Sequence, residues 1–112
     1  MKVGRSTLVQ IALGLSVLLC VIVSPLQAQQ SAEQLYKAKC AMCHGATGKA
    51  DTPAGKSMGA HDFASPEVQK ESEAEVTAII TKGKNKMPAY GTKLKENEIK
   101  ELAAYVKELG KK

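Results

Sequence analysis

Apolar side chains recur at helical spacing in three stretches of the chain, and glycine-rich segments separate these stretches. The most regular stretch covers about residues 96–109, where one face collects Ile99, Leu102, Ala103, Val106 and Leu109 before a stop at Gly110. A second stretch follows Ser72-Glu73-Ala74-Glu75, which fits a capping box, and contains Val76, Ile79 and Ile80. The first runs from about Ser31, a suitable N-cap, to Cys43. Because no alternating strand pattern accompanies them, these stretches predict an all-α domain.

Shorter signals mark the segments between the predicted helices. Residues 45–61 are expected to form a loop, because four glycines and Pro53 interrupt any regular element there. Ser65-Pro66-Glu67 is typical of a further helix start, with proline in the first helical position. Phe63 is the one large apolar residue beside this loop. We expect its ring to cover the core or the edge of a bound group.

The first 28 residues differ from the rest and are interpreted as a secretory signal peptide. Lys2 and Arg5 precede an apolar run over residues 11–23, and cleavage is expected after Ala28. The run is short for a membrane span, which needs about 20 apolar residues, although an uncleaved anchor stays open. Residues 29–112 then form one small domain whose only aromatic side chains are Tyr36, Phe63, Tyr90 and Tyr105. A bound cofactor is expected to complete so small a core.

One short motif, Cys40-Ala41-Met42-Cys43-His44, indicates which cofactor this is. C-x-x-C-H is the attachment signature for c-type haem, in which the two thiols bond to the porphyrin and the histidine binds the iron. Three other interpretations of the cysteine pair stay open: a thioredoxin-like redox pair, a zinc site that includes His61, and a simple disulfide. The first expects strands, and the second lacks a further paired cluster. We therefore expect one haem c, attached through Cys40 and Cys43, with His44 as an axial ligand.

A six-coordinate haem needs a second axial ligand, and the domain offers Met42, Met58, Met87 and His61. Met42 lies inside the attachment motif and cannot reach the opposite face of the ring. Met87 precedes Pro88, which favours an extended backbone at residue 87 and suits a loop that crosses the ring. We expect Met87 to bind the iron. The alternatives are Met58 and, for bis-histidine ligation, His61.

Charge is distributed unevenly along the domain. Residues 29–112 hold 14 lysines, no arginine and 11 acidic residues. A basic rim is expected around the Met87 loop, formed by Lys82, Lys84, Lys86, Lys93 and Lys95, although a solvated lysine-rich loop would look the same in sequence. The opposite side is expected to be negative through Glu67, Glu71, Glu73 and Glu75. Such a rim would steer a redox partner with an acidic docking surface, and no basic and aromatic stripe indicates nucleic acid.

Taken together, these features resemble the class I monohaem cytochromes c, the short soluble carriers of bacterial and photosynthetic chains. The resemblance rests on residues 40–44, on the segment from Gly83 to Gly91 and on residues 102–106, and it covers the whole domain. It implies an all-α class I cytochrome c fold, with three main helices and loops wrapped around one covalently bound haem c. It also implies that Tyr36 and Tyr105 meet where the terminal helices cross, and that the carbonyl of Pro53 accepts a hydrogen bond from His44.

The resemblance implies a monomeric one-electron carrier, not an enzyme, located in the periplasm or, in a photosynthetic organism, in the thylakoid lumen. No stable membrane insertion is expected after the signal is removed. Two alternatives stay open. The domain could be a haem c subunit or tethered module of a larger oxidoreductase. It could also be a haem peroxidase or gas-binding protein, if the methionine ligand is labile.

Overall fold

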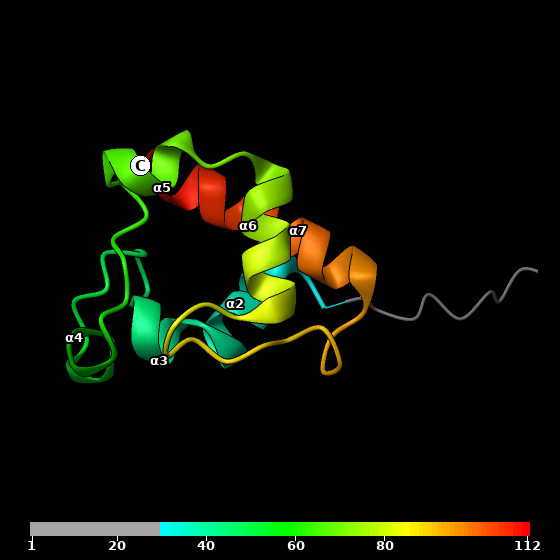
Figure 1. Cartoon of the computed structure of the whole chain (residues 1–112), viewed down its shortest axis with the longest axis horizontal. Coiled ribbons are helices and arrows are strands. Elements are labelled where there is room, and N and C mark those ends of the chain that lie inside the picture. Colours follow the sequence, from blue (N-terminus) through cyan, green and yellow to red (C-terminus); the bar gives the residue numbers. More distant parts are fainter. Residues whose placement is uncertain (1–29) are drawn as a thin grey trace, which may run out of the picture.

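The computed structural model describes residues 30–112, and the predicted signal peptide lies outside this range. Figure 1 shows a short chain of helices joined by loops. In order they are α2 (Ala32–Lys39), α3 (Ala41–His44), α4 (Pro53–Met58), α5 (Pro66–Lys70), α6 (Glu73–Lys82) and α7 (Glu96–Leu109). Within the described residues there is no strand, and the only β-type pairing is an isolated bridge between Lys84 and Met87. The predicted all-α class is therefore confirmed.

The helix starts follow the capping signals in the sequence. The hydroxyl of Ser72 accepts a hydrogen bond from the backbone N–H of Glu75, whose carboxylate accepts one in return from the N–H of Ser72. Ser31 makes the same reciprocal pair with Gln34. Helix α7 has no such hydroxyl, and the carboxylate of Glu98 accepts from the N–H of Lys95 instead, at 2.8 Å. Each arrangement satisfies backbone donors that the first turn of a helix leaves unpaired.

Two predicted boundaries differ from the structure. The first helix is interrupted at Cys40, where the amide N–H of Cys43 binds the carbonyl of Cys40 rather than that of Lys39. The second difference is α4, which lies inside the segment predicted to be a loop. Its start carries the N-cap and proline signal that also precedes α5: Thr52 accepts a hydrogen bond from the N–H of Gly55, and Pro53 is the first helical residue.

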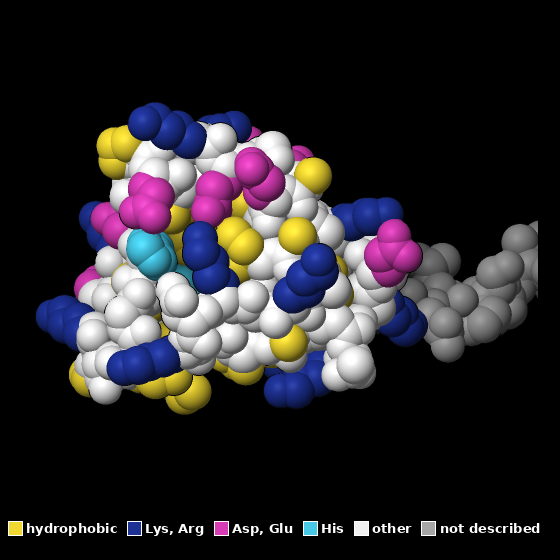
Figure 2. Space-filling model, in the orientation of Figure 1, with side chains coloured by type: hydrophobic (Ala, Val, Ile, Leu, Met, Phe, Trp, Pro, Cys, Tyr) yellow, Lys and Arg dark blue, Asp and Glu magenta, His cyan; other side chains and the backbone are white. Residues whose placement is uncertain are grey.

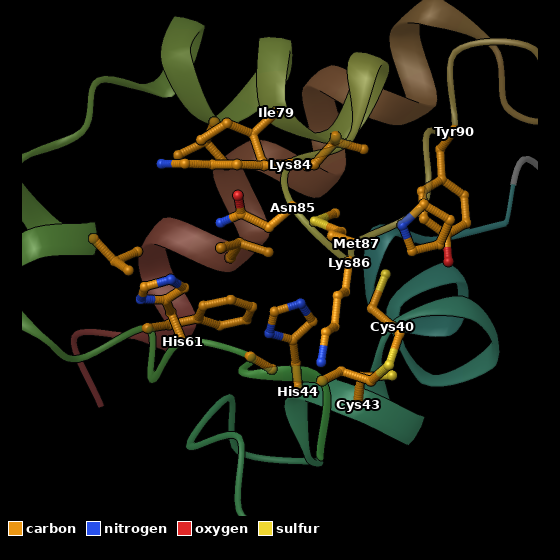
Figure 3. Close-up of a pocket in the computed structure, with 18 of the residues that line it drawn as sticks. Cys40, Cys43, His44, His61, Ile79, Lys84, Asn85, Lys86, Met87 and Tyr90 are labelled. Atoms are coloured by element: carbon orange, nitrogen blue, oxygen red, sulfur yellow. The ribbon is translucent and has the colours of Figure 1, made fainter. Parts of the chain in front are cut away.

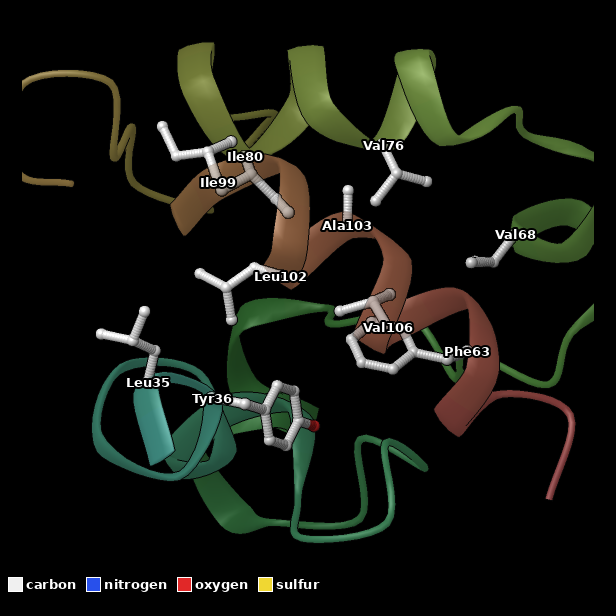
Figure 4. Packing of buried hydrophobic residues seen from close by; sticks show 10 residues of the cluster. All are labelled: Leu35, Tyr36, Phe63, Val68, Val76, Ile80, Ile99, Leu102, Ala103 and Val106. Atoms are coloured by element: carbon white, nitrogen blue, oxygen red, sulfur yellow. The ribbon is translucent and has the colours of Figure 1, made fainter. Parts of the chain in front are cut away.

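The core forms where α7 packs against α6 and α2 (Figure 4). Its largest fully buried side chains are Leu35 and Tyr36 from α2 and Leu102 from α7. The rings of Tyr36 and Tyr105 lie 5.4 Å apart between centroids, so the predicted aromatic contact between the terminal helices is confirmed. Within residues 30–112, no helix is both long and apolar enough to span a bilayer.

Candidate functional site

A cavity of about 320 Å³ opens between the segment of the paired cysteines and the loop that follows α6 (Figure 3). This volume lies within the range of about 300–1,000 Å³ that is usual for small-molecule sites. All four predicted site residues line it: Cys40, Cys43, His44 and Met87. Its walls are mostly apolar and include Phe63, which the sequence predicted beside a bound group, together with Ile79, Ile80 and Leu94.

The interruption at Cys40 shapes one wall of the cavity. Both cysteine side chains are half-buried and reach the cavity, and neither is in a disulfide. Burial, and then the neighbouring Cys43, raises the pKa of the Cys40 thiol to about 11, so this thiol is protonated at neutral pH. Two free thiols that both line one apolar cavity suit covalent attachment of a group that fills that cavity. The simple disulfide is not what the geometry shows.

A network of donors holds the carbonyl groups around the motif. The hydroxyl of Thr52 contacts the carbonyl oxygens of Met42 and Cys43, at 2.8 and 2.9 Å. The phenol of Tyr36 donates to the carbonyl of Gly45 at 2.6 Å. The sequence reasoning missed Thr52, although the Thr-Pro pair was visible as a helix start. These contacts fix the short helix α3, and with it the position of His44.

The His44 side chain is held at the floor of the cavity. Its ring stacks on Phe63 with the centroids 4.6 Å apart. Burial lowers the pKa of the His44 imidazole, which favours the neutral form that binds metals. The predicted hydrogen bond to the Pro53 carbonyl is absent: His44 Nδ1 is buried, and within the described residues the backbone group that acts on this ring is that of His61 rather than Pro53. Since Nδ1 is closed off from solvent, the other ring nitrogen, Nε2, is the one that can bind a metal in the cavity.

Met87 reaches the cavity from a different wall, on the tight loop that follows α6 (Figure 3). The loop turns at Gly83, whose φ is +74°, and a Cβ there would lie 2.6 Å from the carbonyl oxygen of Met87. Asn85 also has a left-handed backbone, with φ at 53°. The amide N–H of Met87 donates to the carbonyl of Lys84 at 2.9 Å, which closes the turn. Only glycine allows both the positive φ and the close approach of the Met87 carbonyl at residue 83.

The sequence profile of the family described as "Cytochrome C oxidase, cbb3-type, subunit III" matches residues 27–106. The chain belongs to the c-type cytochromes. It is 35% identical over 103 residues to a protein named cytochrome c6 from Nostoc sp. (strain PCC 7120 / SAG 25.82 / UTEX 2576), covering 90% of this chain and 88% of that protein. It is 40% identical over 78 residues to cytochrome c6 of Anabaena variabilis, covering 70% and 85%.

A solved structure leads to the same family. The KustC0563 c-type cytochrome has a TM-score of 0.65 and 32% identity, over 70% of this chain and 96% of that one. The protein is therefore a small monohaem class I cytochrome c with the all-α fold of that class. As a member of this family it carries a covalently bound haem c and transfers electrons to and from redox protein partners, rather than acting as an enzyme.

The other sulfur and nitrogen donors of the cytochrome are placed less well than Met87 for axial ligation. Met42 is 76% exposed and Met58 is 42% exposed. Helix α4, which carries Met58, packs on α3, so this side chain approaches from the same wall as His44. His61 is exposed as well, with its Nδ1 3.8 Å from a carboxylate oxygen of Glu67. Met87, in contrast, reaches the cavity from another wall.

Acidic and basic side chains meet at the mouth of the cytochrome's cavity (Figure 2). Lys84 and Lys86 line it as expected, but so do Glu67 and Glu71, which were expected on the opposite side. Lys84 Nζ lies 3.7 Å from a carboxylate oxygen of Glu71. Among the other lysines of the predicted rim, Lys93 lies over the Tyr90 ring, 5.4 Å from its centroid. The mouth is thus mixed in charge rather than uniformly basic.

The position of α5 explains this mixed border. The ammonium group of Lys107 on α7 donates to three carbonyls at the end of α5, those of Val68, Gln69 and Glu71, at 3.3, 2.8 and 2.7 Å. The Gln69 amide also donates to the carbonyl of Phe63 at 2.7 Å. A cation suits the carbonyl end of a short helix. These bonds dock α5 beside the cavity and bring its glutamates to the mouth.

Proposed function

We propose that this cytochrome is a periplasmic one-electron carrier whose haem c is attached through Cys40 and Cys43 and held axially by His44 and Met87. One observation carries the proposal. The paired thiols, the imidazole and the thioether all line the same apolar cavity, and Met87 enters it from a wall other than the one that holds His44. When bound, the haem supplies an iron atom that gains and loses a single electron.

The residues around the cavity have distinct tasks in this proposal. The neutral His44 imidazole would bind the metal through a ring nitrogen. The Met87 thioether would bind on the opposite side and would raise the reduction potential relative to bis-histidine ligation. Ile79, Ile80 and Leu94 exclude water from the cavity, which favours the less charged, reduced state. With both axial positions held by side chains, no open position is left for a substrate.

Replacing each candidate methionine tests the axial ligand. Met87→Ala is expected to remove the charge-transfer band that a ferric iron bound to methionine sulfur shows, and to lower the reduction potential. Met58→Ala is the matched control, because Met58, the last residue of α4, also lines the cavity and is partly exposed. If the band survives Met87→Ala and is lost in Met58→Ala, the ligand assignment is wrong.

We further propose that residues 1–28 are a signal peptide and that residues 29–112 form the exported cytochrome domain. The location is the periplasm, or the thylakoid lumen if the source is photosynthetic. Intact-mass measurement of the purified holoprotein checks this, since cleavage after Ala28 leaves a chain that begins at Gln29 with one haem added. A mature chain that still holds residues 1–28 would contradict the assignment and would indicate a membrane anchor.

A second function is favoured by the description of the matched family, which names a subunit of an oxidase. In that case the domain would be a haem c module of a larger oxidoreductase rather than a free monomeric carrier. Purification under mild conditions separates the two. A monomer in the soluble periplasmic fraction supports the carrier, whereas a haem protein that co-purifies with a membrane oxidase in fixed ratio supports the module.

The proposed partners are redox proteins with acidic docking surfaces, which would meet the lysines at the cavity mouth. In the part of the chain that the structure describes, Lys86 forms no ion pair, and its ammonium group donates to the carbonyl of Ser57 at 3.4 Å. Lys84 is partly neutralised by Glu71. The basic contribution to docking is therefore expected to come more from Lys86 than from Lys84.

A further inference from the structure

The loop that carries Met87 ends at a residue with several anchors, Tyr90. Its backbone N–H donates to the carbonyl of Ile80 at 2.9 Å, and the N–H of Gly91 donates to the carbonyl of Thr81 at 3.0 Å. Both acceptors belong to the last turn of α6, so these bonds close the loop onto the helix from which it starts. They hold the ends of the loop together but do not tie it to the opposite wall of the cavity.

The side chain of Tyr90 makes that second connection. Its phenol donates to the carbonyl oxygen of Lys39 at 3.1 Å. Lys39 ends α2 and immediately precedes Cys40, the first cysteine of the attachment motif. One hydroxyl thus joins the Met87 loop to the segment that holds both thiols and His44, and Figure 3 shows Tyr90 above Cys40 at the edge of the cavity.

The interruption of the first helix makes the Lys39 carbonyl available. In a continuous helix the N–H of Cys43 would bind this carbonyl, but here that N–H binds the carbonyl of Cys40 at 3.2 Å. A carbonyl at the end of a helix needs another donor, and the Tyr90 phenol supplies it. Burial raises the pKa of Tyr90, so the hydroxyl keeps its proton and can donate throughout the neutral range.

We propose that Tyr90 is a positioning residue for Met87, and that its hydrogen bond to Lys39 keeps the Met87 loop closed over the cavity. This inference rests on the proposed function, in which Met87 is an axial ligand. Met87 can leave the metal only if its loop moves away from the opposite wall, and the Tyr90 phenol opposes that movement. Removing the hydroxyl is therefore expected to increase the fraction of molecules in which the loop is open.

Imidazole binding to the ferric holoprotein measures that fraction. Imidazole competes with the methionine, so its apparent affinity rises in proportion to the population of the open form. Tyr90→Phe keeps the ring and its apolar contacts and removes only the hydroxyl. We expect Tyr90→Phe to bind imidazole about fivefold more tightly, which corresponds to about 1 kcal/mol and to one hydrogen bond. Tyr105→Phe, which removes a phenol at the helix crossing, is expected to leave imidazole affinity unchanged.

The outcomes separate this inference from the ligand assignment. If wild type shows the methionine charge-transfer band, Met87→Ala loses it, and Tyr90→Phe binds imidazole as wild type does, then Met87 is the ligand and the role of Tyr90 is wrong. If Met87→Ala keeps the band, the proposed function fails first. An equal increase in Tyr90→Phe and Tyr105→Phe would show general loosening and would also overturn the inference.

A measurement on the unaltered protein covers the case in which Tyr90→Phe matures poorly. In the wild-type ferrous holoprotein, NMR should detect a slowly exchanging Tyr90 hydroxyl proton with a cross-peak to the backbone of Lys39 or Cys40. Detection of this proton supports the hydrogen bond in the haem-loaded state. A Tyr90 ring that flips rapidly, with a hydroxyl in fast exchange with water, would overturn it.

Discussion

The hydroxyl of Thr52 lies 2.9 Å from the carbonyl oxygen of Cys43, the second cysteine of the attachment motif. The hydroxyl oxygen of Thr52 also accepts a hydrogen bond from the N–H of Gly55, at 2.9 Å. One side chain therefore pairs the carbonyl end of α3 with the amino end of α4 and satisfies groups that both helices leave unpaired. The haem attachment segment is thus held by a residue outside the motif itself.

Replacing Thr52 tests how much this connection contributes. Thr52→Val keeps the branched shape but removes the hydroxyl, and we expect it to lower the free energy of unfolding of the holoprotein by about 1–3 kcal/mol, since both helix ends lose a partner. Guanidinium unfolding followed by circular dichroism measures this. Thr92→Val, at an exposed position, is the matched control and is expected to change stability by less than about 0.5 kcal/mol.

The close approach of α4 to α3 leads to a second prediction, which concerns a substitution at Gly55. A Cβ built there would lie within 2.1 Å of the carbonyl oxygen of Cys43. Since backbone cannot yield as a flexible side chain does, Gly55→Ala is expected to displace the attachment segment and to reduce the yield of holoprotein several-fold, with about 3 kcal/mol or more lost from stability. Yield is read from the haem absorbance per unit of purified protein.

Gly59→Ala is the control for that experiment. Gly59 has a left-handed backbone with φ at +68°, but nothing lies within 4 Å of the position a Cβ would take. Strain alone should cost about 1 kcal/mol there, with haem yield close to wild type. Equal losses in the two variants would mean that backbone strain or helix ending, and not the contact with Cys43, limits maturation.

The longer helices could be predicted because their signals are local. The α7 stripe from Ile99 to Val106 and the capping box at Ser72 both act within a few residues, and the structure places α7 and α6 accordingly. The interruption at Cys40 was not predictable in this way. The Lys39 carbonyl that it leaves free is paired with the phenol of Tyr90, far along the chain, and a local pattern does not reveal that partner. Helix α4 is an intermediate case, since its Thr-Pro start is local but was outweighed by nearby glycines.

The candidate site follows the same division. The motif at residues 40–44 and the Met-Pro pair identify the residues that line the cavity, because their chemistry is specific. Whether a charged side chain lies at the cavity mouth depends instead on how the short helices pack against the rest of the domain. Glu71 reaches the mouth only because Lys107 holds the end of α5 from another helix. The predicted hydrogen bond between His44 and the Pro53 carbonyl is absent from the structure, where Pro53 is instead the first residue of α4.

A pH prediction follows from the buried phenol of Tyr36. Burial raises its pKa above the usual 10.0, so the unfolded chain loses this proton first as pH rises. The unfolded state then binds fewer protons than the folded state, and stability falls as pH increases above about 10. Tyr36→Phe should cost about 1–2 kcal/mol at pH 7, through the lost bond to Gly45, but this deficit should shrink above about pH 10.

Guanidinium unfolding of both proteins between about pH 7 and 11 checks this, because the variant lacks only one of the tyrosines. Tyr90 is present in both chains, so its own titration and any alkaline change at the metal cancel in the difference. A deficit that stays constant over the whole range would mean that Tyr36 ionises normally in the folded protein.

The last prediction concerns the mixed charge at the cavity mouth. Lys86 lines the mouth and forms no ion pair within residues 30–112, so it should attract anionic reagents, whereas Lys100 is paired with Glu96 on α7 and does not line the cavity. We expect Lys86→Gln to slow oxidation of the ferrous protein by the trivalent ferricyanide anion about five- to tenfold at low salt, since a lysine charge near 10 Å in water contributes about 0.4 kcal/mol for each charge of the anion. The difference should fade at high salt, as the Debye length shrinks to about 3 Å at 1 M.

The control variant Lys100→Gln changes the net charge equally and should have a smaller effect. Stopped-flow rates measured over a salt series decide between them, and equal slowing in both variants would assign the effect to net charge rather than to the mouth.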